Sequence, residues 1–153
     1  NVMVSNFREY YKLVSYFSHF NIKKLRIVIG IPTLIKVLDR SFYRHLKGGI
    51  LEAFGKLFPE NMKMYVYPAL TPDQAGLLNT STIEVEEEIK LLFEYLRQNR
   101  MIIDIENANT KRMHITSAQV MSMIKNGENG WEKMVPRYIS DTIISKKLFG
   151  YSG

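Results

Sequence analysis

The sequence predicts an α/β fold: a three- to four-stranded, mainly parallel, Rossmann-like half-sheet flanked by helices. Short β-branched runs that end at Gly or Pro alternate with segments of helical spacing, which is typical of a parallel sheet. Some thirty residues separate the first two runs, enough for a helical crossover. A length of 153 residues with 46% hydrophobic residues suits one core. We therefore expect a single domain over 1–153, with an N-terminal helix in 1–22 and the sheet in 23–150.

The first predicted element is a helix over residues 5–20. Its apolar residues recur at a spacing of three and four, which puts an aromatic stripe on one face and predicts that this face is core. The stripe consists of Phe7, Tyr10, Tyr11, Val14 and Phe17. A buried strand follows at 25–30, ended by Gly30 and by Pro32 shortly after it.

Helical spacing returns from Thr33 to Phe58, and Gly48-Gly49 predicts a break between two helices there. Residues 64–67 predict a second strand, closed by Pro68, and the polar stretch 69–81 predicts a loop. Ser81 and Glu84 have the spacing of a capping box, so we expect the next helix to begin there.

Four glutamates, at 84, 86, 87 and 88, open that helix. Acidic side chains are favoured in a first helical turn, and we prefer this interpretation to a catalytic or metal-binding one. Beyond it we expect a third strand at 101–105, a possible fourth at 112–115, and helices near 117–126 and 137–147.

Composition restricts the classes of function. The chain has no cysteine, which excludes disulfides and cysteine nucleophiles and favours a reducing compartment, so we expect a cytoplasmic protein. No apolar stretch is long enough for a membrane span, and we expect no membrane partner. The net charge of +6 comes from residues 1–56, which hold ten Lys or Arg against three Asp or Glu. These basic residues are scattered among apolar ones, unlike the arginine-dense runs of nucleic-acid-binding arms.

Common enzyme motifs are missing from the sequence. It has no dinucleotide-binding glycine motif, phosphate-binding P-loop, zinc-protease motif or serine-hydrolase elbow. His19, His45 and His114 lie in three different predicted elements with no acidic residue at a useful spacing. We therefore assign no catalytic and no metal-binding residue.

The segment beginning at Ile115 is the most informative for function. If Thr116 ends a strand and begins a helix, its hydroxyl and the free backbone N–H groups can hold an anion. Thr116 and Gln119 also have the spacing of a capping box, which needs no ligand. Both interpretations stay open.

This segment resembles the closing motif of the nicotinate and nicotinamide mononucleotide adenylyltransferases, I-S-S-T-x-I-R-x-x-I-x-x-G followed by V-P-x-x-V-x-x-Y-I-x-x-x-x-L-Y. The matching residues are Ile115, Thr116, Ser117, Val120, Ile124, Gly127, Val135, Pro136, Ile139, Ile143, Leu148 and Phe149. Residues 29–34, with Asp39, Phe42 and Tyr43, are similar to another family stretch, and 65–68 to the family's next strand. The resemblance covers 25–150, with 69–100 as an insertion.

The sequence also departs from the family pattern. The histidine-containing loop after the family's first strand has no counterpart, so the chain resembles only the C-terminal half of this nucleotidyltransferase fold. Met121 replaces the arginine that grips the triphosphate, Ala118 a neighbouring threonine, and Pro32 an aspartate. Methionine cannot donate the forked hydrogen bonds of guanidinium, so we expect no adenylyl transfer by this chain alone.

The resemblance implies a function in dinucleotide (NAD) synthesis within a longer parent, where ATP is a substrate and Mg²⁺ the ion. It implies nucleotide contacts at Gly30, Thr33, Thr116 and Ser117, and we expect Gly30 and the Thr116-Ser117 pair to face one cleft. Two alternatives are a non-catalytic nucleotide-binding domain and a protein-interaction domain. Finally, strand 25–30 would have an open edge, and we expect the 5–20 helix or a second copy of the chain to cover it.

Overall fold

Three parallel strands form the central sheet: β1 (Leu25–Gly30), β2 (Met62–Tyr67) and β5 (Ile102–Asp104). β2 lies in the middle, with Met64 opposite Ile27 of β1 and opposite Ile102 of β5. The strand at 25–30 has the predicted bounds, whereas β2 begins two residues earlier than predicted. The predicted α/β class with a parallel sheet is confirmed. This computed structural model describes residues 5–73 and 75–152.

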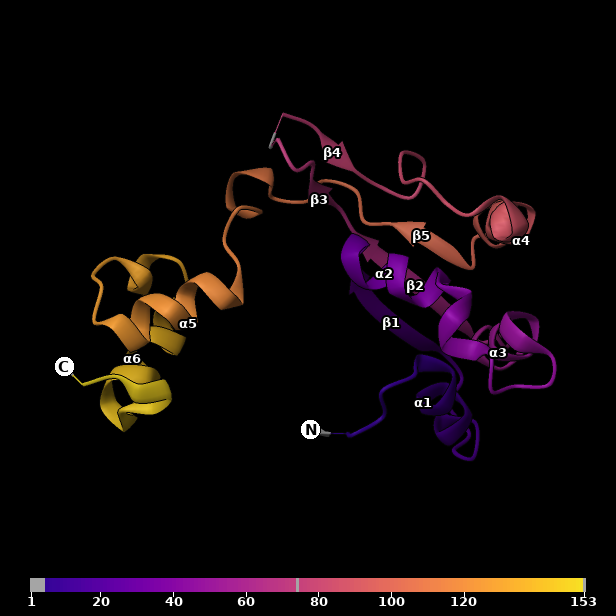
Figure 1. Ribbon diagram of the computed structural model, residues 1–153. Helices are drawn as coiled ribbons and strands as arrows, with labels where there is room; N and C mark the ends of the chain where they lie inside the picture. Colours follow the sequence, from indigo (N-terminus) through magenta and orange to yellow (C-terminus); the bar gives the residue numbers. More distant parts are fainter. Residues whose placement is uncertain (1–4, 74, 153) are drawn as a thin grey trace. The chain divides into compact units, whose positions relative to one another are not determined.

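Helices fill the connections between these strands (Figure 1). α2 (Ile31–Leu38) and α3 (Gly49–Leu57) connect β1 to β2, and α4 (Glu87–Gln98) precedes β5. α1 (Tyr10–Phe17) comes before β1 and packs against α3. Because right-handed crossovers that step in one direction place their helices on the same face, one face of the sheet receives these helices.

The covered face of the sheet forms the main core. Ile29, Met64, Val66 and Ile102 alternate with outward-facing residues and are at most 6% exposed. They pack with apolar residues of the helices, which are Tyr11, Val14, Leu34, Val37, Leu38, Ala53, Phe54, Leu57, Ile89, Phe93 and Leu96. The opposite face carries Arg26, Val28, Lys63, Tyr65, Tyr67 and Ile103, none of which is buried. Val28 is 64% exposed there.

β1 is an edge strand, because β2 is its only strand neighbour among the described residues. α1 directs its buried residues, Tyr11 and Val14, into the core it shares with α3. Coverage of strand 25–30 by the N-terminal helix is not tested by these contacts and stays a prediction. Pairing of that strand with a second copy stays a prediction.

Several predicted boundaries differ from the structure. The first helix after β1 ends at Leu38 and a 3-10 helix follows at Arg40–Tyr43, because Asp39 has extended backbone angles and caps that turn through Ser41 N–H. The polar stretch 69–81 contains a short antiparallel hairpin of β3 (Ala69–Leu70) and β4 (Leu77–Leu78).

The predicted capping box of Ser81 and Glu84 is wrong. The Ser81 hydroxyl donates to Asn79 Oδ1 at 2.6 Å, and α4 begins only at Glu87. Glu87 and Glu88 do occupy its first turn, as predicted. Arg40 binds Glu86 at 3.0 Å and Glu88 at 3.1 Å, so part of the acidic cluster holds the 3-10 turn after α2.

The predicted fourth strand at 112–115 is also wrong. A 3-10 helix occupies Thr110–Arg112 and a turn follows, with the Ile115 N–H donating to Arg112 O at 3.1 Å. The residues at 112–115 close a local turn instead of pairing with a strand.

The chain divides into two compact units, Asn1–Ala108 and Asn109–Gly153. The second unit contains α5 (Ser117–Asn126) and α6 (Arg137–Lys146), with 3-10 helices at Trp131–Lys133 and Leu148–Gly150. Its core is formed by Val120, Ile124, Trp131 and Ile143. The single domain stays a prediction. In the described part of the chain, no helix has the length and apolar character that crossing a membrane requires.

Candidate functional site

The three parallel strands of the first unit end together at one edge of the sheet. Their last residues are Gly30, Tyr67 and Asp104. Ligands of open α/β sheets bind at this carboxyl edge, so we expect a ligand site there.

Gly30 joins β1 directly to α2 and is the N-cap of that helix. Its φ of −91° suits any residue, and a Cβ added there would meet only Pro32 Cδ, at an ordinary 3.7 Å. The fold itself therefore does not require glycine at this position, which leaves room for a functional reason.

Thr33, in the first turn of α2, is half-buried and lines a pocket of about 290 Å³. The pocket is bounded by Arg8, Glu9, Tyr10, Thr33, Lys36, Val37, Phe42 and Tyr43. Phe42 is 53% exposed. Two cations and two accessible aromatic side chains thus stand close to a predicted site residue.

Some polar side chains of this pocket are hydrogen-bonded to protein groups and others are not. Glu9 binds Lys12 at 2.9 Å, and this hydrogen bond lowers the pKa of the Glu9 carboxyl. Tyr43 donates to the Val37 carbonyl at 2.8 Å, and burial raises the pKa of its phenol to about 12. Arg8 and Lys36 make no hydrogen bond or ion pair within the described residues. They are the cations that remain available to an anion.

Thr116 and Ser117 belong to the second unit, where the structure supports the capping interpretation of Thr116. The Thr116 hydroxyl oxygen accepts a hydrogen bond from the Gln119 N–H at 3.2 Å, as an N-cap of α5 does. No strand precedes it, so the expected position at the end of a strand is wrong. Both residues are exposed. The first unit contains Gly30 and Thr33, and the second contains Thr116 and Ser117. The cleft that we expect them to share therefore stays a prediction.

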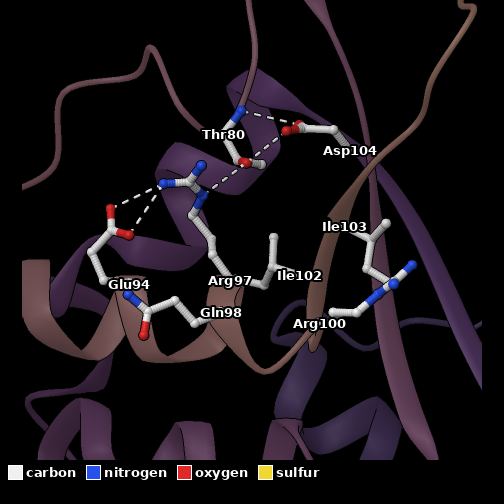
Figure 2. A pocket seen from close by; sticks show the side chains of 8 residues that line it. All are labelled: Thr80, Glu94, Arg97, Gln98, Arg100, Ile102, Ile103 and Asp104. Carbon is white, nitrogen blue, oxygen red and sulfur yellow. Dashed lines mark hydrogen bonds and ion pairs between the residues drawn. The ribbon is translucent and has the colours of Figure 1, made fainter.

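A second pocket in the first unit, of about 300 Å³, was not expected from the sequence (Figure 2). Thr80, only 4% exposed, lies between Asp104 at the end of β5 and Arg97 of α4. Its hydroxyl donates to Asp104 Oδ2 at 2.7 Å and accepts from Arg97 Nε at 3.1 Å. Arg97 Nη1 also donates to Glu94 at 3.0 Å.

This polar network ties the loop before α4 onto the end of β5. Both Asp104 oxygens and two of the three Arg97 nitrogens are already bound to protein groups. The signal in the sequence was an aspartate at the end of a predicted strand. Its partner Thr80 lies 24 residues away, and Arg97 lies 17 residues from Thr80, so no local pattern joins the three.

Two of the three histidines lie within hydrogen-bond distance of another group. His45 Nε2 lies 3.1 Å from the Tyr11 hydroxyl, and His19 Nδ1 lies 3.2 Å from the Tyr16 carbonyl. Within residues 5–73 and 75–152, no three His, Cys, Asp or Glu side chains are grouped as metal ligands.

Comparison of the chain with models of protein families, with curated proteins and with solved structures finds no match. The functional assignment therefore depends on the residues and geometry above.

Proposed function

We propose that the chain binds a nucleotide through its first unit, in the pocket that Thr33 lines. The observation that carries this proposal is the pairing of Tyr10 and Phe42 with Arg8 and Lys36 around one pocket. A nucleotide presents a flat base, which stacks on aromatic rings, and phosphates, which cations bind. Thr33 lines the same pocket, and its hydroxyl can donate and accept hydrogen bonds.

The sequence resemblance extends the proposal to a reaction. We propose that the chain is the C-terminal region of a nicotinate/nicotinamide nucleotide adenylyltransferase-like protein that contributes to NAD synthesis. In the longer parent, ATP is the substrate that supplies the adenylyl group and Mg²⁺ accompanies its phosphates. Transfer depends on positive charge placed around those phosphates, and Met121 on α5 supplies none.

Binding is tested by isothermal titration and thermal shift with ATP, nicotinamide mononucleotide, nicotinate mononucleotide and NAD. We expect at least one of them to raise the melting temperature of the chain. Lys36→Gln should weaken that binding about tenfold, because it removes one charge-assisted contact to phosphate. Lys23→Gln is the matched control, since Lys23 is an exposed lysine outside the pocket.

Two results would overturn the proposal. One is an unchanged melting temperature with every nucleotide at millimolar concentration. The other is equal weakening of binding by Lys36→Gln and Lys23→Gln, which would show only a general effect of net charge. Ser117→Ala tests the nucleotide contact predicted at the start of α5. The nucleotide affinity of this variant should fall only if α5 also holds phosphate.

A second candidate, a protein-interaction domain, is favoured by an aromatic cluster around α1. Phe7, Tyr16, Phe17 and Phe20 contact one another with Tyr16 at the centre, at ring-centroid distances of 5.2–5.7 Å. Phe7, Tyr16 and Phe20 are each 41–50% exposed. Exposed aromatic groups of this kind are typical of interfaces.

An assay of pyrophosphate release distinguishes an enzyme from a non-catalytic nucleotide-binding domain. We expect none from this chain with ATP and a pyridine mononucleotide, and release from the full-length parent if the parent is an active adenylyltransferase. Release by this chain would contradict the role we assign to the missing arginine.

A further inference from the structure

One edge of β1 has no strand partner among the described residues. The Leu25 N–H donates to Asn61 O at 3.0 Å, so Leu25 turns its hydrogen-bonding groups toward β2. These groups alternate along a parallel strand, so those of Arg26 and Val28 point away from β2. β1 is the last strand in the sheet order, and no strand of the described residues receives them.

This edge lacks the usual protection against pairing. Edge strands are commonly kept apart by proline, by bulges or by charged side chains, and β1 contains neither proline nor an acidic residue. Its one charged residue, Arg26, donates through Nη1 to Leu25 O at 2.7 Å and to Asn61 O at 3.0 Å. The guanidinium is thus held on its own strand and on the turn before β2.

We propose that β1 pairs in antiparallel orientation with β1 of a second copy, around a two-fold axis at Ile27. In this register Ile27 lies opposite Ile27 of the second copy, and Leu25 opposite Ile29. Apolar residues of the covered sheet face therefore meet apolar residues. On the other face Arg26 lies opposite Val28, so the two Arg26 charges are not opposed.

The same register fits the backbone. Arg26 and Val28, whose groups point outward, become the hydrogen-bonded pairs, and two such pairs give four N–H···O bonds. All residues from Leu25 to Ile29 find an opposite residue. An axis at Val28 would pair Arg26 with Gly30 and leave Leu25 opposite Ile31 of α2, so only the axis at Ile27 pairs all three apolar residues of the covered face within the strand.

A second copy is favoured over an unrelated strand because the edge is self-complementary in this register. A two-fold interface uses the same patch of both molecules. Here the apolar residues of the covered face lie opposite one another, and Arg26 lies opposite Val28 and not opposite a second Arg26. The result is a six-stranded sheet that continues across two molecules.

Single cysteines test the register, since the chain has none of its own. Opposite residues at a non-hydrogen-bonded antiparallel position have Cα atoms about 4.5 Å apart, within disulfide range. Ile27→Cys should therefore form a covalent dimer on mild oxidation. Leu25→Cys is the control, because two Leu25 residues would be offset by four positions, about 13 Å, and should stay uncrosslinked.

Sedimentation of the full chain tests the dimer without oxidation. We expect a monomer–dimer equilibrium in which Val28→Pro raises the dissociation constant about 30-fold, because each copy loses one outward N–H. Proline is tolerated where the N–H faces away from the sheet, so the far-ultraviolet circular dichroism should not change. Val28→Thr keeps the N–H and the β-branched shape, and should dimerise like the parent.

Two results would overturn the proposal. A chain that stays monomeric at several hundred micromolar has no such interface, and equal crosslinking of Ile27→Cys and Leu25→Cys excludes the register. Neither outcome bears on nucleotide binding, which is measured separately at the pocket of Thr33.

Discussion

Thr80 and Asp104 are joined by two hydrogen bonds. The Thr80 N–H donates to Asp104 Oδ1 at 3.0 Å, and the Thr80 hydroxyl donates to Oδ2 at 2.7 Å (Figure 2). The same hydroxyl accepts from Arg97, so one buried side chain satisfies an anion and a cation at once. The loop before α4 is thereby fixed over the end of β5.

Thr80→Val should destabilise the first unit by about 2 kcal/mol, because the carboxylate and the guanidinium each lose a partner in a place with little water. Thr80→Ser keeps the hydroxyl and should recover most of this loss. Urea unfolding followed by circular dichroism measures both variants. A Thr80→Val protein as stable as the parent would show that water replaces the hydroxyl at no cost.

The buried phenol of Tyr43 should make the free energy of unfolding fall at high pH. Burial raises the pKa of its phenol to about 12 in the folded chain, against about 10 when unfolded. Because the unfolded chain releases this proton first, the contribution is complete below pH 10 and falls by about 2 to 3 kcal/mol as pH rises toward 12. The free energy of unfolding of Tyr43→Phe should fall less steeply between pH 10 and 12. Equal slopes for variant and parent would contradict the burial of this hydroxyl.

Thr116→Ala should destabilise the second unit by about 1 kcal/mol through loss of the α5 N-cap. The only tryptophan, Trp131, lies in the core of that unit, so its fluorescence reports unfolding there. Thr116→Ser keeps the cap and serves as the control. If Thr116→Ala leaves the fluorescence transition unchanged, the hydroxyl is free for another role.

Two glycines should respond differently to alanine. Gly127 ends α5 with a φ of +66°, so Gly127→Ala should cost about 1 kcal/mol. Gly30→Ala should change the free energy of unfolding by less than about 0.5 kcal/mol, since its backbone angles and surroundings accept a Cβ.

Gly30→Ala also tests nucleotide binding. If glycine at 30 allows close approach of a ligand, Gly30→Ala should weaken nucleotide binding while the melting temperature of the free chain hardly moves. Unchanged binding by Gly30→Ala would remove Gly30 from the site and leave Thr33 as its only tested member.

Local patterns predicted elements best where one short segment contains its own boundaries. Strand 25–30 has a β-branched run and a terminal glycine, and α5 has a threonine cap and a C-terminal glycine. The predicted strand at 112–115 failed because a short segment becomes a strand only when a neighbouring strand pairs with it, and a 3-10 helix and a turn occupy this one instead. The capping box at Ser81 failed because Asn79 offered the serine a nearer partner.

The three strands of the central sheet, its parallel class and the lack of cysteine chemistry were decided by the sequence alone, since each depends on spacing or composition. Only the tertiary structure placed Thr33 in a pocket with aromatic and cationic neighbours and joined Thr80, Arg97 and Asp104. Such contacts link residues that are distant along the chain. Their energies depend on burial and geometry that no short segment contains.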